Sequence, residues 1–493
     1  MTEAITQDDA DIKALAKGGR TNVFGFLLRL AARLPFLFIA GRLYGADALG
    51  RFAYAILIVE LVAQLATLGL RRGLAEALSR AEKPDSHVVA DALLVASIAS
   101  ALGAVVLIAF PHIMFPNSAI NGMDRFLPLT IFAIVSTDIA LAALAYRFDV
   151  ASAVRARAIV EPWTISIGAG LLVFYSTRDG LILSYVASIA AGLVAALWPL
   201  ARSYGRPNGW RPAPAELVAL ARRNLPLAAA DAAEWGSRRL DLAILGLFAS
   251  PAVVGIYYVA QQVASLPQKL KSSFDPILGP VITRNLLAKN YAEIARQVGQ
   301  VGFWIIAAQA GIALALGIPG EGVLGLVGPE FVGGIGALAF LLLAEVAAAT
   351  AVVSESALVY MARHRNLLLS IAMLAVQVVM SVIFIKLLDL WPHPPLGRGL
   401  LQGAAVAAAL MLSLAVGSFA KSRLLARLLD HRLSIWRWSL LPAIAVAVII
   451  GSVAVRLPEW AELALGIPAI LGGYFWVIWR WGFGPEDRVL FKR

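Results

Sequence analysis

Long apolar runs separated by short charged connectors recur along almost the whole chain, and they constrain its fold more than any other feature. Each run has about 20 residues, the length that an α-helix needs to cross a bilayer. Within the bilayer core, backbone N–H and C=O groups must find partners inside the protein, which favours helices. The composition agrees, with 60% hydrophobic residues, 15% charged residues and a mean hydropathy of +0.78. We therefore expect an all-α polytopic membrane protein.

The apolar runs predict about fourteen transmembrane helices. They lie near residues 21–44, 49–70, 88–110, 126–147, 160–177, 181–201, 225–249, 251–275, 298–325, 331–360, 365–388, 397–419, 437–456 and 459–481. Of the 42 Lys and Arg residues, about 31 fall in tails and loops on one side of the membrane and about 7 on the other. Because basic residues concentrate in cytoplasmic loops, both termini are expected in the cytoplasm. The net charge of +11 then needs no nucleic acid as a partner.

The first 20 residues are polar and lack the short apolar core of a signal peptide, so we expect a cytoplasmic tail. The chain has no cysteine, which excludes disulfides, thiolate metal sites and cysteine nucleophiles. It also lacks the HExxH, GxSxG and Walker sequences of several large enzyme classes. We therefore expect a membrane transporter rather than an enzyme, with no cofactor and no metal.

The hairpin of the first two spans recurs in the second half of the chain. A shift that aligns Arg33 with Arg238 also aligns Gly50-Arg51-Phe52 with Gly255-Ile256-Tyr257. Both copies enter from the cytoplasm, so the repeat is parallel, and such repeats place a cargo site at mid-membrane. The expected organisation is a cytoplasmic tail (1–20), an N-lobe of six spans (21–205), a linker (206–224), a C-lobe of six spans (225–420), and two extra C-terminal helices with an interfacial helix and a cytoplasmic tail (421–493).

Several stretches, spread over nearly the whole chain, resemble those of one superfamily. They are Gly41–Ala55, Leu68–Arg80, Pro276–Val298, Val323–Glu345 and Met361–Asn366. Together they are similar to the polysaccharide (oligosaccharidyl-lipid) flippases of the multidrug/oligosaccharidyl-lipid/polysaccharide exporter superfamily. The resemblance implies two six-helix lobes that rock between inward-open and outward-open states.

Four arginines lie inside the apolar spans, where a charge is costly and usually has a function. They are Arg29, Arg33, Arg238 and Arg239. At the helical rise per residue, Arg33 lies roughly 18 Å and Arg238 about 20 Å from the inner ends of their spans. Because one guanidinium group can donate two parallel hydrogen bonds to phosphate oxygens, we interpret the four arginines as contacts for the pyrophosphate of a polyprenyl-linked cargo. The alternative is pairing within the helix, of Arg238 with Glu234 or with Asp241.

Acidic and amide side chains inside the spans form a second set of candidates. A carboxylate in an apolar helix either pairs with an arginine or takes up a proton, because burial disfavours its charged form. Ion coupling and static charge pairing stay open as interpretations of Glu60, Asp138, Asp231, Glu234 and Asp241. We expect Gln261, Gln262 and Lys269 to line the cavity, because Pro267 bends their helix.

The resemblance and the intramembrane arginines favour a flippase for a polyprenyl-(pyro)phosphate-linked oligosaccharide. It would move this cargo from the inner to the outer leaflet of the bacterial inner (plasma) membrane, for O-antigen (lipopolysaccharide), exopolysaccharide or other surface polysaccharide biosynthesis. Expected partners are the cargo, membrane lipid, and a polysaccharide polymerase or chain-length protein. Three alternatives stay open: a peptidoglycan lipid-precursor flippase, a cation-coupled drug exporter, and a membrane polysaccharide polymerase or ligase.

Two features count against the last two alternatives. Cation-coupled drug exporters usually line their cavity with acids and aromatic residues, whereas this chain carries arginines inside its spans. Membrane polymerases and ligases typically carry a large polar outer loop. The longest outer loop expected here, Pro111–Arg125, is short and has no acid–base cluster.

Overall fold

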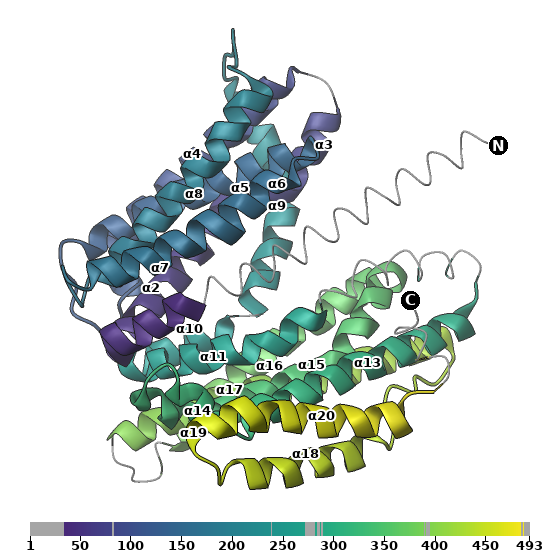
Figure 1. Cartoon of the computed structure of the whole chain (residues 1–493). Coiled ribbons are helices and arrows are strands. Elements are labelled where there is room, and N and C mark those ends of the chain that lie inside the picture. Colours follow the sequence, from purple (N-terminus) through teal and green to yellow (C-terminus); the bar gives the residue numbers. More distant parts are fainter. Residues whose placement is uncertain are drawn as a thin grey trace. The chain divides into compact units, whose positions relative to one another are not determined.

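The computed structural model describes residues 34–80, 83–237, 239–271, 282, 286, 289–388, 390, 395–484 and 487. All regular secondary structure in these residues is helical. The chain divides into two compact units, unit 1 (Met1–Arg239) and unit 2 (Leu240–Arg493), coloured from purple to teal and from teal to yellow in Figure 1. Helix α9 (Pro214–Ser237) belongs wholly to unit 1, although it covers part of the predicted linker and the start of the predicted C-lobe. The predicted lobe boundaries stay a prediction.

Unit 1 is built around helix α5. Its helices are α2 (Gly45–Ala66), α3 (Leu70–Ser79), α4 (Asp85–Ala109), α5 (Thr130–Tyr146), α6 (Val150–Val154), α7 (Glu161–Leu172), α8 (Gly180–Tyr204) and α9 (Pro214–Ser237). Helix α5 packs against α2, α3, α4, α6 and α8. Most of the α5 side chains are apolar, and most of them are buried inside unit 1.

The chain turns at Gly45, between the predicted first and second spans. A π-helical turn (Ala40–Tyr44) ends there, and Gly45 has a φ of 81°, which glycine adopts at little cost. The buried Tyr44 hydroxyl donates a hydrogen bond to the backbone oxygen of Ala169 on α7 at 2.7 Å. Gly180 makes room for the ring, since a Cβ added there would lie 2.5 Å from the Tyr44 hydroxyl. Tyr44 therefore ties this turn to the end of α7 and the start of α8.

Helix α9 packs closely on the corner between α2 and α3. A Cβ added at Gly69, whose φ is +71°, would lie 2.6 Å from the backbone nitrogen of Ala228 on α9. A Cβ added at Gly73 would lie 1.6 Å from Oδ1 of Asn224, also on α9. Small residues let helix backbones approach in this way. The contact fixes α9 against α2 and so positions Arg239, which follows α9.

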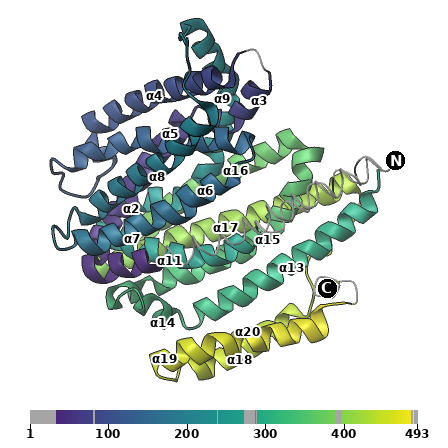
Figure 2. The same cartoon turned by 45° about the horizontal axis from the view of Figure 1, so that its top comes forward.

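Unit 2 is built around helices α15 and α17. Its helices are α10 (Leu240–Phe248), α11 (Pro251–Lys271), α13 (Tyr291–Gly317), α14 (Gly320–Gly325), α15 (Ile335–Met361), α16 (Arg363–Leu388), α17 (Pro395–Leu429), α18 (Leu440–Ala454), α19 (Glu459–Ala461) and α20 (Ile467–Val477). Helices α18 and α20 lie side by side and pack on α13 (Figures 1 and 2). Glycines permit this packing: a Cβ added at Gly311 of α13 would lie 2.9 Å from the ring of Tyr474 on α20.

Within the described residues, 9 helical segments are long and apolar enough to cross a membrane. They are Leu34–Ser79, Asp85–Ala109, Asp124–Tyr146, Gly180–Tyr204, Tyr291–Gly317, Pro329–Met361, Arg363–Leu388, Gly397–Leu429 and Glu459–Gly482. The first of these joins two predicted spans across the turn at Gly45, and α18 is a shorter apolar helix. The protein is therefore an all-helical, multi-pass membrane protein.

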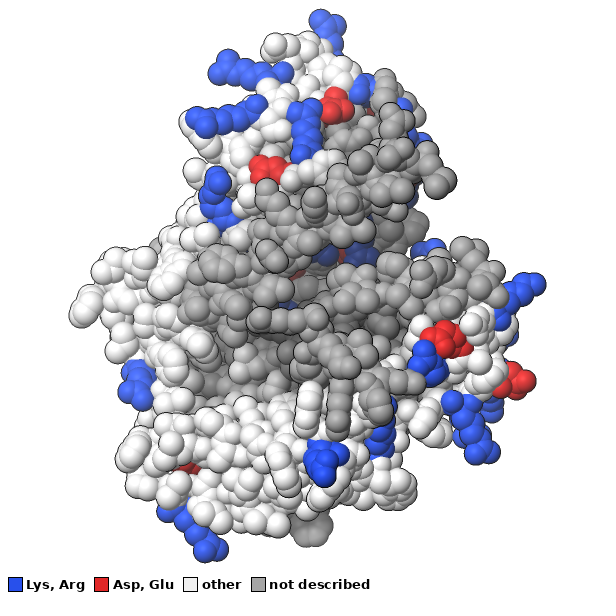
Figure 3. Space-filling view, turned by 45° about the vertical axis from the view of Figure 1, so that its right-hand side comes forward, with Lys and Arg blue, Asp and Glu red and all other residues white. Residues whose placement is uncertain are grey.

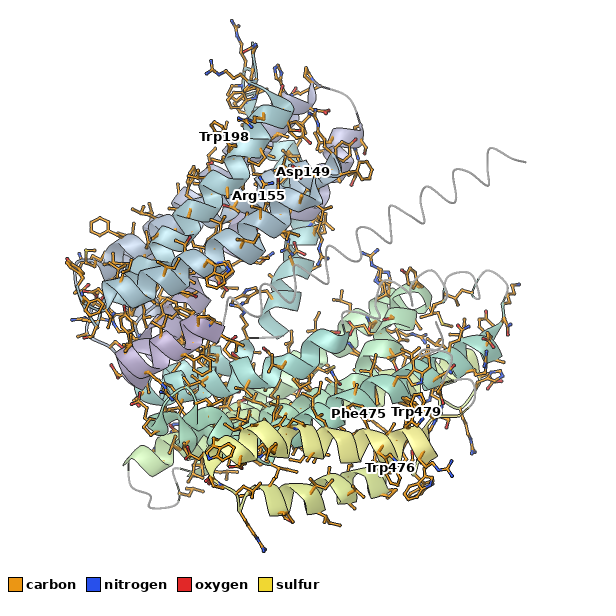
Figure 4. All side chains as sticks on the ribbon, viewed as in Figure 1. Asp149, Arg155, Trp198, Phe475, Trp476 and Trp479 are labelled. Atoms are coloured by element: carbon orange, nitrogen blue, oxygen red, sulfur yellow. The ribbon has the colours of Figure 1, made fainter. Side chains whose placement is uncertain are left out.

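Exposed tryptophans mark both ends of the last span. Trp460 is 71% exposed at its start, and Trp476 is 62% exposed near its other end. Figure 4 shows Phe475, Trp476 and Trp479 at this end of α20. From Trp460 to Trp479 a helix rises about 28 Å, close to the roughly 30 Å of a bilayer's hydrocarbon core. Tryptophan is enriched at membrane–water interfaces, so we expect these residues near the two surfaces of the membrane.

Candidate functional site

A group of charged and polar side chains gathers in the interior of unit 1, and we call it the charge cluster. Its members come from α2, α5, the π-helical turn Arg155–Val160, α7, α8 and the residue after α9: they are Glu60, Asp138, Arg157, Glu161, Tyr185 and Arg239. Asp138 is the middle residue of α5 (Thr130–Tyr146). On the insertion scale, a charge at the centre of a membrane helix costs about 2.5–3.5 kcal/mol. Such positions therefore require partners.

Arg157 bridges two acids from different helices. Its Nη1 donates to Oε1 and Oε2 of Glu161 at 2.9 and 3.0 Å, and its Nη2 donates to Oδ1 of Asp138. All three side chains are partly accessible, with exposed fractions of 25% for Arg157, 18% for Asp138 and 14% for Glu161. π-helical turns of this kind are frequent at functional sites.

Helix α8 holds Glu161 in place. Ser188 donates a hydrogen bond from its hydroxyl to the backbone oxygen of Glu161 at 2.8 Å. Gly192, one turn further along α8, lies against the Glu161 side chain, and a Cβ added there would be 2.4 Å from Oε1. The glycine therefore allows Glu161 to reach Arg157 with both oxygens.

Arg239 and Glu60 form the second ion pair of the charge cluster. Arg239 Nη1 donates to Oε2 of Glu60 on α2, and the guanidinium carbon lies 5.3 Å from the ring centre of Trp235. The exposed fractions are 38% for Arg239 and 29% for Glu60, so neither partner is fully covered by protein. The pair ties the end of α9 to α2 and keeps both charges accessible.

Tyr185 lies beside both ion pairs. This α8 side chain is only 7% exposed, and its ring packs edge-on against Phe52 at a centroid distance of 6.1 Å. It interacts electrostatically with Glu60 and Arg239 and also with Glu161 and Arg157. Both ion pairs therefore lie in the electrostatic surroundings of Tyr185, and we treat the charge cluster as one candidate site.

Asp231 occupies a different place. It is 2% exposed, and its Oδ1 lies 2.8 Å from Nε of Arg72 on α3, although that N–H is not aligned for a hydrogen bond. Asp231 precedes Arg239 in the chain by about two helical turns. Because this ion pair joins α9 to α3 beside Gly69 and Gly73, it stabilises the packing of unit 1.

Asp241 in unit 2 is held by neutral donors. It is 1% exposed, the Tyr257 hydroxyl donates to Oδ2 at 2.7 Å, and Gln261 Nε2 donates to the carboxylate at 3.0–3.2 Å. Gln261 is therefore engaged with Asp241, and Gln262 beside it is partly exposed.

Arg29, Arg33 and Arg238 lie outside the described residues, as do the side chains of Glu234 and Lys269. Their predicted roles stay predictions.

Three members of the charge cluster escaped the sequence analysis: Arg157, Glu161 and Tyr185. Arg157 was assigned to an inner connector because charges lower the hydropathy ahead of the fifth predicted span. The available signal was the four-residue spacing of Arg157 and Glu161, which places them on one helix face.

A second polar network in unit 1, around Arg51, was also missed. The 6% exposed Arg51 donates to Asp124, and its guanidinium lies 4.6 Å from the Phe115 ring centre. Asn121 Nδ2 donates to Asp179 at 2.9 Å, which joins the loop before α5 to the start of α8. Because Arg51 and Asp124 are buried, we interpret their ion pair as structural, whereas Asp179 is 17% exposed.

The described residues contain no group of three or more His, Cys, Asp or Glu side chains placed to hold a metal ion.

In Figure 3, Lys and Arg side chains gather at the upper end of unit 1, whereas its described flank is mostly free of charge. This distribution fits a membrane-crossing unit with a charged end and a charge cluster inside it.

The family described as "Polysaccharide biosynthesis protein" matches residues 24–286, which is more than half of the chain. The chain belongs to the polysaccharide biosynthesis protein family. This match includes every member of the charge cluster. No curated protein matches the chain in a direct sequence comparison.

Several solved structures share the fold of this family member. A lipid II flippase MurJ in an inward closed conformation matches with a TM-score of 0.70 at 11% identity, over 96% of this chain and 99% of that chain. An inward-facing multidrug resistance MATE family transporter of the MOP superfamily matches with a TM-score of 0.62 at 14% identity, over 82% of this chain and 95% of that chain. A MOP superfamily transporter from Pyrococcus furiosus matches with a TM-score of 0.54 at 15% identity, over 84% of this chain and 96% of that chain. The chain therefore has the fold of MOP superfamily transporters.

Proposed function

We propose that this family member is a flippase for a polyprenyl-(pyro)phosphate-linked oligosaccharide. It moves the cargo from the inner to the outer leaflet of the bacterial inner membrane by alternating access. The pathway is the biosynthesis of a surface polysaccharide such as O-antigen or exopolysaccharide. The partners are membrane lipid and a polysaccharide polymerase or chain-length protein.

The observation that carries the proposal is the charge cluster in a chain of this family and fold. A cavity for a lipid-linked saccharide must accept a doubly charged headgroup while the prenyl tail stays in lipid. Arg157 and Arg239 supply guanidinium groups inside unit 1, each partly exposed and each held by an acid. Guanidinium groups recognise phosphate oxygens through paired N–H donors, so the cluster suits this headgroup.

The proposal includes a finer architecture. About fourteen spans form two lobes of six, related by a parallel repeat, with α18 and α20 as two further spans and both termini in the cytoplasm. Support comes from the excess of basic residues in the tails and loops expected on the cytoplasmic side, and from the packing of α18 and α20 on α13. A cysteine-accessibility scan of this cysteine-free chain measures the topology directly.

The test uses the purified protein in liposomes with a fluorescent polyprenyl diphosphate oligosaccharide. We expect the labelled saccharide to reach the opposite leaflet faster than in protein-free liposomes, as measured by accessibility to an external glycosidase. In cells, deletion should remove surface polysaccharide while the lipid-linked precursor accumulates. A deletion strain with normal polymer, or one that only becomes drug-sensitive, contradicts the proposal.

A second candidate is a flippase for the peptidoglycan lipid precursor. It is favoured by the match to the lipid II flippase over 99% of that chain at a TM-score of 0.70. Depletion separates the two candidates, because loss of a peptidoglycan precursor lyses the cells, whereas loss of a surface polysaccharide precursor leaves them intact.

A further inference from the structure

Arg157 is held unequally by its two acids. Both Glu161 oxygens accept from its Nη1, and Glu161 is four residues along the same helical segment. Ser188 and the close approach of Gly192 brace Glu161 from α8. Asp138 holds Arg157 through Nη2 alone and comes from a different helix, α5. The contact with Asp138 is therefore the one that a competitor displaces more easily.

A phosphate oxygen competes with a carboxylate oxygen for the same N–H donors. Because a diphosphate carries more charge and more acceptor oxygens than one carboxylate, it is a strong competitor for a guanidinium group. The exposed fractions of 25% for Arg157 and 18% for Asp138 leave part of this contact uncovered by the described residues. Arg239, the other guanidinium of the charge cluster, is also accessible and pairs with Glu60.

We propose that Arg157 contacts the cargo's diphosphate by exchange: Nη2 leaves Asp138 and donates to a phosphate oxygen, while Glu161 keeps the guanidinium in position. This inference rests on the proposed function and assigns opposite roles to two acids. Asp138 competes with the cargo and weakens its binding. Glu161 is a positioning residue that strengthens it. No bond is made or broken other than hydrogen bonds.

The groups around Arg157 come from each helix that packs on it. They are Asp138 on α5, Glu161 on α7, Tyr185 on α8, and the Glu60–Arg239 pair. Glu161 accepts two hydrogen bonds from Nη1, so removal of the Asp138 charge leaves Arg157 paired with Glu161. The variant Asp138→Asn therefore keeps a stable site and removes only the competing charge.

The test is a binding measurement on the full chain in phosphatidylcholine nanodiscs, with undecaprenyl diphosphate as the probe. Undecaprenol tests for binding by the tail alone, and inorganic diphosphate tests for binding without the tail. We expect Asp138→Asn to bind the probe several-fold more tightly, Glu161→Gln several-fold more weakly, and Arg157→Ala about tenfold more weakly, as for the loss of one charge-assisted contact. Arg157→Lys should also bind the probe weakly, because lysine keeps the positive charge but lacks the planar guanidinium group that donates two parallel hydrogen bonds.

The control is Asp487→Asn, which removes a carboxylate from an arginine pair in unit 2, outside the spans. It should leave the affinity unchanged. Melting temperatures report whether each variant folds, and if Arg157→Ala does not, the opposite signs of Asp138→Asn and Glu161→Gln decide alone. Weaker or unchanged binding by Asp138→Asn overturns the exchange while the flippase proposal stands. A wild-type protein that neither binds the probe nor moves the oligosaccharide overturns both.

Discussion

The charge cluster of unit 1 and the Asp241 site of unit 2 handle an intramembrane carboxylate in different ways. In unit 1, Glu60 and Asp138 face arginines, and 29% and 18% of these acidic side chains are exposed. In unit 2, Asp241 is 1% exposed and accepts hydrogen bonds from the neutral side chains of Tyr257 and Gln261. A partner that carries a charge and meets solvent can be exchanged for a charged ligand. A buried carboxylate with neutral donors is closed to such exchange.

The largest expected effect is that of a substitution at Arg239. Arg239→Ala leaves Glu60 without this partner and removes a guanidinium from the charge cluster. We expect the rate of oligosaccharide transfer in liposomes to fall by about a hundredfold, or ~2.7 kcal/mol in the barrier. Protein level and the amount of lipid-linked precursor should stay normal in cells.

The double variant Arg239→Ala/Glu60→Gln separates function from stability. It removes the unpaired charge, so we expect the melting temperature to recover while transfer stays slow. Recovery of transfer in the double variant would mean that Arg239 only neutralises Glu60. In that case the two units would use their carboxylates in the same structural way.

The sequence was sufficient for the membrane class of the fold, because hydropathy acts over whole spans and the bilayer requires internal hydrogen bonding. It was also sufficient to select Glu60 and Asp138 as acids in need of a partner. It could not supply the partners, because these depend on which helices are adjacent. Arg157, which contacts Asp138, lies in the π-helical turn that precedes α7, and hydropathy does not register that turn.

The same limit applies to Asp241. The sequence offered Arg238, three residues away, as a partner within the helix, and Arg238 lies outside the described residues. The contacts that the structure shows come instead from Tyr257 and Gln261 on the next helix, α11. Pairing within one helix can be read from spacing, whereas pairing between helices requires the tertiary structure.

The Asp241 site is tested by two substitutions, one that removes both side-chain oxygens and one that keeps the shape of the side chain and one oxygen. Asp241→Ala leaves the Tyr257 hydroxyl and the Gln261 amide buried without this acceptor, at a cost of about 1–3 kcal/mol. Asp241→Asn keeps an oxygen for the Tyr257 hydroxyl and should cost much less. We expect the melting temperature in detergent to fall for the alanine variant and to stay near wild type for the asparagine variant.

The opposite order at Asp241 would change the comparison. If Asp241→Asn lowers oligosaccharide transfer as strongly as Arg239→Ala does, while the melting temperature stays unchanged, then the charge of Asp241 is functional. The closed site of unit 2 would then take part in ion coupling, which is the second interpretation that the sequence offered for this residue.

The smallest expected effect concerns Asp487, a carboxylate of unit 2 outside the spans. Burial raises the pKa of Asp487, but hydrogen bonds outweigh it and the net pKa lies below the usual value. The donors are Arg437 at 2.6 Å, the Gly484 N–H at 2.8 Å, Trp304 at 2.9 Å and Gln300 at 3.0 Å. Since the pKa is lower in the folded state, Asp487 stabilises unit 2 above the unfolded pKa of about 3.9. This stabilisation is lost as the pH falls through the folded pKa.

Thermal unfolding of the wild type and Asp487→Asn over a pH series measures this contribution. The wild type should be the more stable protein by a constant margin above about pH 5, and the margin should shrink below about pH 4. A margin that stays the same in acid would assign the effect to hydrogen-bond geometry and not to charge. Asp487 would then resemble Asp241, whose donors are neutral. A margin that shrinks in acid would instead show that Asp487, like the acids of the charge cluster, is held by arginine charge. The acids of the charge cluster differ from Asp487 in that they remain open to exchange.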